Sequence, residues 1–267
     1  MSTTNSKHKN IFFVFDGMIG NGKSTAIKYI KQGVDEIKEL VNSKIEGKIK
    51  LNFYFKDERA AISPFLAELY DVFAKQTTEE IYNDEASQSI LRKIEHSFIS
   101  SMGEDIKRFI DIAKEPMEDE EVTNVNVFVL DRALQSVELF IRYYNEYKVL
   151  TPESFNHLNN VIKDYKDEYD FLISNNIENK AFRAIRNKLI STTEEQGYSN
   201  VVKRSRNGEV MSKEYYNELY TFYQNNRERI FGDNSKNVVI TNNGTHNELR
   251  DKIIMEVFND IRDIIKV

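Results

Sequence analysis

The sequence predicts an α/β fold in which helices cover both faces of a five-stranded parallel sheet. Short apolar runs alternate with longer segments of helical spacing along the 267 residues. An unbroken apolar run is typical of a strand buried on both faces, and strands that alternate with helices are typical of a parallel sheet. Neither an internal repeat nor a break in composition divides the chain, so we expect one domain over residues 1–267, with residues 1–9 as a disordered polar tail.

The short apolar or alternating runs predict the strands, which are Asn10–Phe15, Lys48–Phe55, Asn124–Leu130, Phe171–Ser174 and Asn237–Thr241. Apolar residues at helical spacing predict the helices, which are Ser24–Glu39, Pro64–Phe73, Ala86–Ala113, Leu134–Tyr147, Pro152–Tyr165, Glu178–Leu189, Ser212–Phe231 and Asn247–Ile265. Two polar segments interrupt this pattern, Lys75–Glu85 and the basic Ser191–Gly208.

The composition limits the classes of function. Hydrophobic residues make up 40% and charged residues 30%, as in an ordinary globular protein, and the formal net charge of -6 argues against a nucleic-acid polymer as the main partner. With no cysteine, the chain has no disulfide, thiolate metal site or cysteine nucleophile. No apolar run reaches the ~18 residues needed to span a bilayer, and the polar start lacks a signal or transit pattern, so we expect a cytoplasmic or nucleocytoplasmic protein with no membrane partner.

Residues Gly17–Ser24 match the phosphate-loop motif G-x-x-x-x-G-K-[ST] between a predicted strand and a predicted helix. Glycines let successive backbone N–H groups surround phosphate oxygens, and the following helix adds its positive dipole end. Lys23 supplies a cation for the β- and γ-phosphates, and the Ser24 hydroxyl can ligate Mg²⁺. The motif therefore predicts that ATP and Mg²⁺ bind at Gly17, Met18, Ile19, Gly20, Asn21, Gly22, Lys23, Ser24 and Thr25.

Further motifs follow the predicted strands. Glu58 comes after the second strand, with Pro64-Phe65-Leu66 and Tyr70 beyond it; Asp131-Arg132-Ala133 closes the third strand; and Lys203-Arg204-Ser205-Arg206-Asn207-Gly208-Glu209 precedes the helix predicted from Ser212. A guanine-specific N-K-x-D motif is missing, because Asn179-Lys180-Ala181 is followed by Phe182. This absence weakens a GTPase interpretation.

Together with the phosphate loop, these motifs resemble the deoxynucleoside kinase family, which includes thymidine, deoxycytidine, deoxyadenosine and deoxyguanosine kinases. The resemblance is patchy and runs from Phe13 to about Tyr223. It implies a three-layer P-loop fold with a mobile lid, transfer of the ATP γ-phosphoryl group to the 5′-hydroxyl of a deoxynucleoside in nucleotide salvage, and a homodimer packed through helices.

On the acceptor side, the resemblance makes Glu58 the general base at the sugar 5′-hydroxyl. A carboxylate suits this role, because a primary alcohol attacks phosphorus better as its proton departs. Arg59 stands where the family has proline, and a solvated charge run at Lys56–Arg59 is the alternative interpretation.

At the third strand, the resemblance implies that Asp131 holds Mg²⁺ directly or through water and that Arg132 bridges donor and acceptor oxygens in the transition state. Ala133 replaces the family serine. The alternative for Asp131 and Arg132 is a surface ion pair at a strand end.

In the lid motif, the resemblance places Arg204 and Arg206 over the ATP phosphates and pairs Glu209 with Tyr70 at the sugar 3′-hydroxyl. Arg183 matches a basic residue on the preceding helix. The residues NKLISTTEEQGYSNVV, between Arg186 and Lys203, have no counterpart in this comparison. A basic surface loop is the alternative interpretation.

For the base, the resemblance offers Gln88, whose amide carries both a donor and an acceptor; an exposed helical glutamine is the equal alternative. Val137, six residues past Asp131, takes a position where thymidine-preferring members carry a small apolar residue. Glu95 stands where some members have arginine. Together these positions favour a pyrimidine, thymidine first.

We therefore expect an ATP-dependent deoxynucleoside kinase. A thymidylate-type monophosphate kinase is the nearest alternative, and Arg59 supports it because a phosphate-bearing acceptor needs a cation. A nucleotide-binding module without catalysis is the alternative from another class, and the departures at Arg59 and Ala133 would be its signs.

Overall fold

The computed structural model describes residues 8–56, 76–115, 121–175, 185–204, 212–231 and 237–266. Its strands are β1 (His8–Asp16), β2 (Ile49–Lys56), β3 (Thr123–Asp131), β4 (Ile185–Ser191) and β5 (Asn237–Thr241). Its helices are α1 (Lys23–Gln32), α2 (Val34–Lys44), α4 (Thr78–Asn83), α5 (Glu85–Lys114), α6 (Leu134–Glu146), α7 (Pro152–Asn175), α8 (Glu194–Arg204), α9 (Lys213–Phe231) and α10 (His246–Ile265).

The strands of these residues form one five-stranded parallel sheet in the order β2-β3-β1-β4-β5. In the register of the central strand β1, Phe15 lies opposite Asp131 of β3, and Asp16 lies opposite Leu189 of β4. Because all the strands are parallel, their carboxyl ends lie at one edge of the sheet, where the segments that follow them meet. The predicted α/β class, a parallel sheet flanked by helices, is confirmed.

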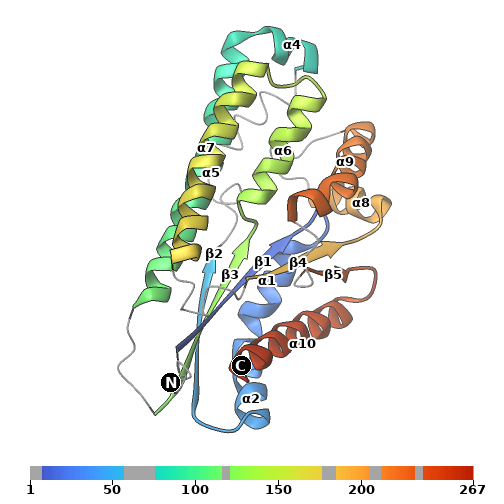
Figure 1. The fold of residues 1–267 in the computed structure, drawn as a ribbon. Helices are drawn as coiled ribbons and strands as arrows, with labels where there is room; N and C mark the ends of the chain where they lie inside the picture. Colours follow the sequence, from blue (N-terminus) through green and yellow to red (C-terminus); the bar gives the residue numbers. More distant parts are fainter. Residues whose placement is uncertain are drawn as a thin grey trace.

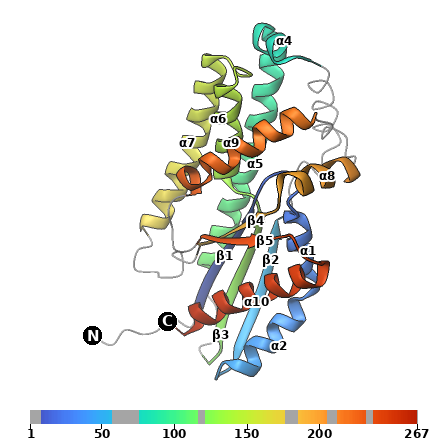
Figure 2. The same ribbon diagram turned by 90° about the vertical axis from the view of Figure 1, so that its right-hand side faces the viewer.

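Alternate residues of β1 face opposite sides of the sheet. Ile11, Phe13 and Phe15 belong to a core shared with α1, α2 and α10, and these helices lie in front of the sheet in Figure 2. On the other side, Phe12 stacks on Phe128 of β3 with ring centroids 4.6 Å apart, in a core shared with α5, α6 and α7. Figure 1 shows these three helices as a bundle that extends beyond the carboxyl edge of the sheet.

The helices α8 and α9 lie at the carboxyl edge, beside the end of β4 (Figures 1 and 2). Tyr216 of α9 and Val201 of α8 share a core with Met18 of the phosphate loop and Tyr143 of α6. This core therefore attaches both helices directly to the loop after β1. Within the part of the chain that the structure describes, no helix is long and apolar enough to cross a membrane.

The predicted fourth strand at Phe171–Ser174 is wrong. Those residues belong to the last turns of α7, and the fourth strand is β4, which overlaps the helix predicted at Glu178–Leu189. A run of three apolar residues fits a strand and a helix equally well, and periodicity alone does not separate them.

The fourth strand, β4, was not predicted because it contains charged residues, which are unusual in a buried strand. Lys188 is fully buried in β4, where its Nζ lies 2.7 Å from Asp260 Oδ2 and 3.0 Å from Glu256 Oε2 of α10. Arg186 also pairs with Asp260, at 3.5 Å. A buried cation in a strand is tolerated only when it is paired, and the partners lie about seventy residues along the chain.

Other boundaries also differ from the prediction. The single helix expected at Ser24–Glu39 is divided into α1 and α2 at Gly33, where a Cβ would lie 2.5 Å from Ile254 Cδ1 of α10. The polar segment Lys75–Glu85 contains α4, which begins with a capping box between Thr77 and Glu80. The basic segment Ser191–Gly208 contains α8, and the residues NKLISTTEEQGYSNVV form most of β4 and most of α8. The helix predicted at Pro64–Phe73 lies outside the described residues.

Candidate active site

The loop that joins β1 to α1 turns through glycines whose φ angles are unfavourable for other residues, 148° at Gly17, 84° at Gly20 and 99° at Gly22. Gly22 is also the N-cap of α1, and a Cβ there would lie 2.6 Å from Nδ2 of Asn242. Glycine is therefore required at this position for both backbone angle and space. The N–H groups of the first turn of a helix have no carbonyl partner within the helix, which makes the end of the loop favourable for an anion.

Lys23 lies inside the loop although it is the first residue of α1. Its Nζ donates to the backbone carbonyl of Gly17 at 3.0 Å and to that of Met18 at 3.3 Å, and the residue is only 6% exposed. The ammonium group is thus held among the backbone atoms that would surround a phosphate.

Ser24 and Asp131 form the oxygen-rich part of the site. Ser24 Oγ donates to Asp131 Oδ2 at 3.1 Å, because β3 lies beside β1 and its last residue faces the beginning of the loop. Hydroxyl and carboxylate oxygens are the ligands that Mg²⁺ prefers, so this pair fits that ion. Among the described residues, no group of three or more His, Cys, Asp or Glu could hold a metal ion. Phosphate or water oxygens would therefore complete the coordination.

A fully buried carboxylate, Asp16, connects this loop to Arg132. Its Oδ1 accepts from the Gly17 N–H at 2.6 Å and from the Tyr223 hydroxyl at 3.1 Å, and lies 3.7 Å from Arg132 Nη1; its Oδ2 accepts from Ser136 Oγ. Burial raises the pKa of Asp16, while the neighbouring cations and hydrogen bonds oppose that rise. The ends of β1 and β3 and the helices α6 and α9 therefore share one polar centre.

Arg132 itself has an unusual backbone. Its φ is 70°, its N–H donates to the Phe15 carbonyl at 3.0 Å, and its guanidinium lies 5.2 Å from the centroid of the Phe140 ring. A left-handed conformation at a residue with a side chain costs about 1 kcal/mol or more and is found preferentially at functional sites. The side chain is 5% exposed and lines the cavity described next.

A cavity of about 250 Å³ opens above the loop. It is lined by predicted residues, which are Ile19, Gly20, Gly22, Lys23, Ser24, Thr25, Arg132 and Arg204, and by residues that the sequence analysis missed, which are Asn200, Asn242, His246 and Leu249. Asn200 lies four residues before Arg204, so recognition of α8 as a helix would have placed both on one face. Asn242 directly follows β5, a position that is predictable once that strand is known.

Several predicted site residues cannot be placed. Glu58, Tyr70, Arg183, Arg206 and Glu209 lie outside the described residues. The helix that was to carry Arg183 is absent where the chain is described, because Ile185–Leu189 belongs to β4.

The three positions considered for the base, Gln88, Val137 and Glu95, are all buried inside the protein. Gln88 is 1% exposed; its Nε2 donates to the carbonyls of Ile81 at 2.9 Å and Val149 at 2.7 Å, and its Oε1 accepts from the Thr151 N–H at 3.1 Å. This amide is engaged by backbone groups, which favours a structural role over pairing with a base. Val137 is buried in the core between the sheet and α5.

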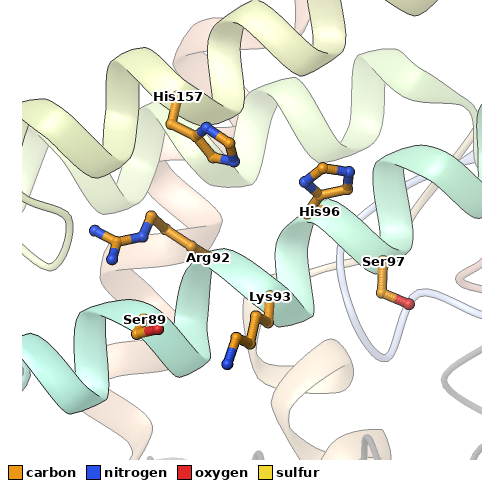
Figure 3. Close-up of a pocket in the computed structure, with 6 residues that line it drawn as sticks. All are labelled: Ser89, Arg92, Lys93, His96, Ser97 and His157. Atoms are coloured by element: carbon orange, nitrogen blue, oxygen red, sulfur yellow. The ribbon is translucent and has the colours of Figure 1, made fainter.

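Another cavity, of about 340 Å³, lies against α5 and α7, away from the phosphate loop. Its lining residues are Ser89, Arg92, Lys93, His96, Ser97 and His157. The rings of His96 and His157 lie side by side, with centroids 5.7 Å apart (Figure 3). Arg92 is held by Ser154 at 3.0 Å and by Glu85 at 2.7 Å. None of these residues belongs to the motifs of the phosphate loop.

No protein-family model matches the sequence, and no curated protein matches it. Solved structures of deoxyadenosine kinase from M. mycoides do have a similar fold. With the products dCMP and a flexible dCDP, the TM-score is 0.59 at 14% identity, over 93% of this chain and 100% of that chain. For the structure with bound dCTP, the TM-score is 0.58 at 13% identity, and the match covers 93% of this chain and 100% of that chain. For the structure with bound dATP, the TM-score is 0.57 at 14% identity, and the match covers 92% of this chain and 99% of that chain. The predicted likeness in fold is confirmed.

Proposed function

Because this chain has the fold of a deoxynucleoside kinase, we propose that it transfers the γ-phosphoryl group of ATP to the 5′-hydroxyl of a deoxynucleoside. The observation that carries this proposal is the convergence of Lys23, Ser24, Arg132 and Arg204 on one cavity above a phosphate loop. Three of them follow β1 or β3, and Arg204 ends α8, so elements from separate parts of the chain build one anion site.

The positions of these residues suggest how each would act on the phosphates of ATP, the phosphoryl donor. Backbone N–H groups of the loop and the Lys23 ammonium bind the phosphates, and Arg204 adds a second cation from α8. Arg132 acts on the charge that develops between donor and acceptor oxygens, since a guanidinium can contact both through its fork of donors. Ser24 and Asp131 would hold Mg²⁺, which would neutralise phosphate charge.

The acceptor side rests on the sequence resemblance. Glu58 takes the proton from the 5′-hydroxyl, Glu209 and Tyr70 bind the 3′-hydroxyl, and Arg206 and Arg183 contact the donor phosphates. On the sequence resemblance alone, we extend the proposal to a pyrimidine base, thymidine first, and to a role in salvage by a cytoplasmic homodimer.

The first experiment is ATP consumption by the purified chain with each of the four deoxynucleosides and with thymidine monophosphate. We expect turnover with at least one deoxynucleoside, and a loss of more than about 100-fold in Lys23→Ala without loss of the fold. Near-wild-type turnover by a folded Lys23→Ala protein would refute the phosphate-loop assignment.

The second experiment separates the nucleoside from the monophosphate as acceptor. Glu58→Gln keeps the shape of the side chain but cannot accept the proton, so we expect normal ATP binding with much slower transfer to deoxynucleosides. Arg59→Ala is assayed in parallel with thymidine and thymidine monophosphate. If wild type barely uses thymidine and Arg59→Ala destroys activity on the monophosphate, the monophosphate kinase is the correct assignment; ATP binding with no transfer to any acceptor supports the nucleotide-binding module.

A further inference from the structure

The carbonyl groups on the outside of the phosphate loop are held by side chains from distant segments. The Ile19 carbonyl accepts from the Tyr216 hydroxyl at 3.0 Å, and the Gly20 carbonyl accepts from Asn200 Nδ2 at 2.9 Å. The Asn21 carbonyl accepts from Asn242 Nδ2, also at 2.9 Å. These donors come from α9, from α8 and from the turn after β5.

Two of these donors, Tyr216 and Asn242, also determine where N–H groups of the loop point. In a planar trans peptide the C=O and N–H groups point in opposite directions. With the Ile19 and Asn21 carbonyls fixed toward Tyr216 and Asn242, the N–H groups of Gly20 and Gly22 are turned the other way. Both glycines line the 250 Å³ cavity. The donors therefore fix the orientation of these two N–H groups in the part of the loop that lines the cavity.

The packing around these hydrogen bonds leaves no room for the loop to move outward. A Cβ at Gly20 would overlap the Gly197 carbonyl of α8, and a Cβ at Gly197 would overlap the Tyr216 hydroxyl. Tyr216 is completely buried, and this burial raises the pKa of its hydroxyl, which therefore stays protonated and able to donate. Loop, α8 and α9 are thus in direct contact through two glycines and one phenol.

We propose that Tyr216, Asn200 and Asn242 are positioning residues that hold the phosphate loop in its phosphate-binding conformation before the nucleotide binds. The inference rests on the proposed ATP site and adds residues that no phosphate-loop motif contains. Ordering the loop in advance strengthens binding, because less conformational freedom is lost when the ligand arrives. Asn200 shares the cavity-facing side of α8 with Arg204, so the same contact also fixes the position of that cation.

The test uses two matched hydroxyl deletions on α9. Tyr216→Phe removes the hydroxyl that holds the Ile19 carbonyl. Tyr220→Phe is the control, because the Tyr220 hydroxyl donates at 2.9 Å to the carbonyl of Thr192, outside the loop. Calorimetry measures the dissociation constants of ATP and of tripolyphosphate in the full chain, and urea unfolding measures stability.

We expect Tyr216→Phe to raise the dissociation constants of both ligands by about threefold to tenfold, which corresponds to one neutral hydrogen bond. Tyr220→Phe should change these constants less than twofold while lowering the stability by a similar amount. Asn200→Ala and Asn242→Ala should weaken both ligands in the same way. In turnover, the KM for ATP should rise by the same factor while the KM for the acceptor stays unchanged, a split that a general loss of stability does not produce.

Equal ligand affinities in wild type, Tyr216→Phe and Asn200→Ala would overturn this inference and leave the proposed function intact. An equal loss of affinity in Tyr220→Phe would also overturn it, since the effect would then be one of stability. If wild type binds neither ATP nor tripolyphosphate, the proposed function and this inference fail together.

Discussion

Replacement of Arg132 tests the polar centre around Asp16. Arg132→Met keeps much of the side-chain length but leaves a fully buried carboxylate without its nearest guanidinium. At the observed 3.7 Å and an effective dielectric constant of about 20, the lost attraction is about 4 kcal/mol. This agrees with the ~3–5 kcal/mol measured when one member of a buried ion pair is removed. We therefore expect the midpoint of thermal unfolding to fall by roughly 10 °C at pH 8.

The loss should depend on pH in a defined direction. Burial already raises the pKa of Asp16, and loss of Arg132 raises it further. A carboxyl group whose pKa is higher in the folded than in the unfolded state binds its proton more tightly when folded, so stability falls as the pH rises through the folded pKa. The destabilisation by Arg132→Met should therefore be largest at pH 8 and smaller at pH 5, where Asp16 is closer to protonation.

The assay is urea unfolding at both pH values for wild type, Arg132→Met, Asp16→Asn and the double variant. The double-mutant cycle should give a coupling of about 3 kcal/mol at pH 8. Arg142→Met is the control, because Arg142 pairs with Glu138 at 2.8 Å on the partly exposed surface of α6 and its loss should cost less than about 1 kcal/mol. An equal loss at pH 5 and pH 8 would refute the reasoning and assign the effect to lost packing on Phe140.

Further predictions concern the core and the misassigned residues. Phe128→Ala should destabilise the protein by about 3–5 kcal/mol in urea unfolding, because its ring is fully buried between Phe12 and Tyr54; a loss below about 1 kcal/mol would contradict this packing. Gln88→Leu should lower the free energy of unfolding by about 2–3 kcal/mol through unsatisfied backbone groups, while the relative rates with the four deoxynucleosides stay unchanged; altered rates in a stable variant would restore its role at the base. Lys188→Met should cost less than Lys188→Ala in the same unfolding assay, since both remove the ion pairs but methionine fills the buried space; the reverse order would contradict the close packing of this side chain.

The sequence was sufficient for the class of fold and the phosphate loop, because both depend on local patterns. The predicted strand Asn124–Leu130 ends in an unbroken apolar run from Val127, and the loop motif is contiguous. The fourth strand could not be predicted in this way, because Lys188 is acceptable in the sheet only when α10 supplies Asp260. Likewise, the break at Gly33 depends on Ile254, more than 200 residues later. Local periodicity carries no information about such contacts.

The candidate site shows the same division. Lys23, Ser24 and Asp131 were predicted from motifs; Lys23 and Ser24 line one cavity, and Asp131 accepts a hydrogen bond from Ser24 Oγ. Asn200 and Tyr216 were missed, because an isolated asparagine or tyrosine has no signature until the helices that carry them are placed against the loop. Gln88 illustrates the opposite error, since a residue type suited to base pairing is used here to hold backbone groups together.

The segments after four strands of the parallel sheet, β1, β3, β4 and β5, each supply a different part of the site. The phosphate loop follows β1, Arg132 follows β3, the helix that carries Asn200 and Arg204 follows β4, and Asn242 follows β5. A change in any one of these connections alters a single part of the site and leaves the hydrogen-bonded strands as they are. The strands of the sheet and the site residues carried by these connections can therefore change independently in evolution. Exchanging one connection between this chain and a protein of the same fold should alter only the part of the site that this connection supplies.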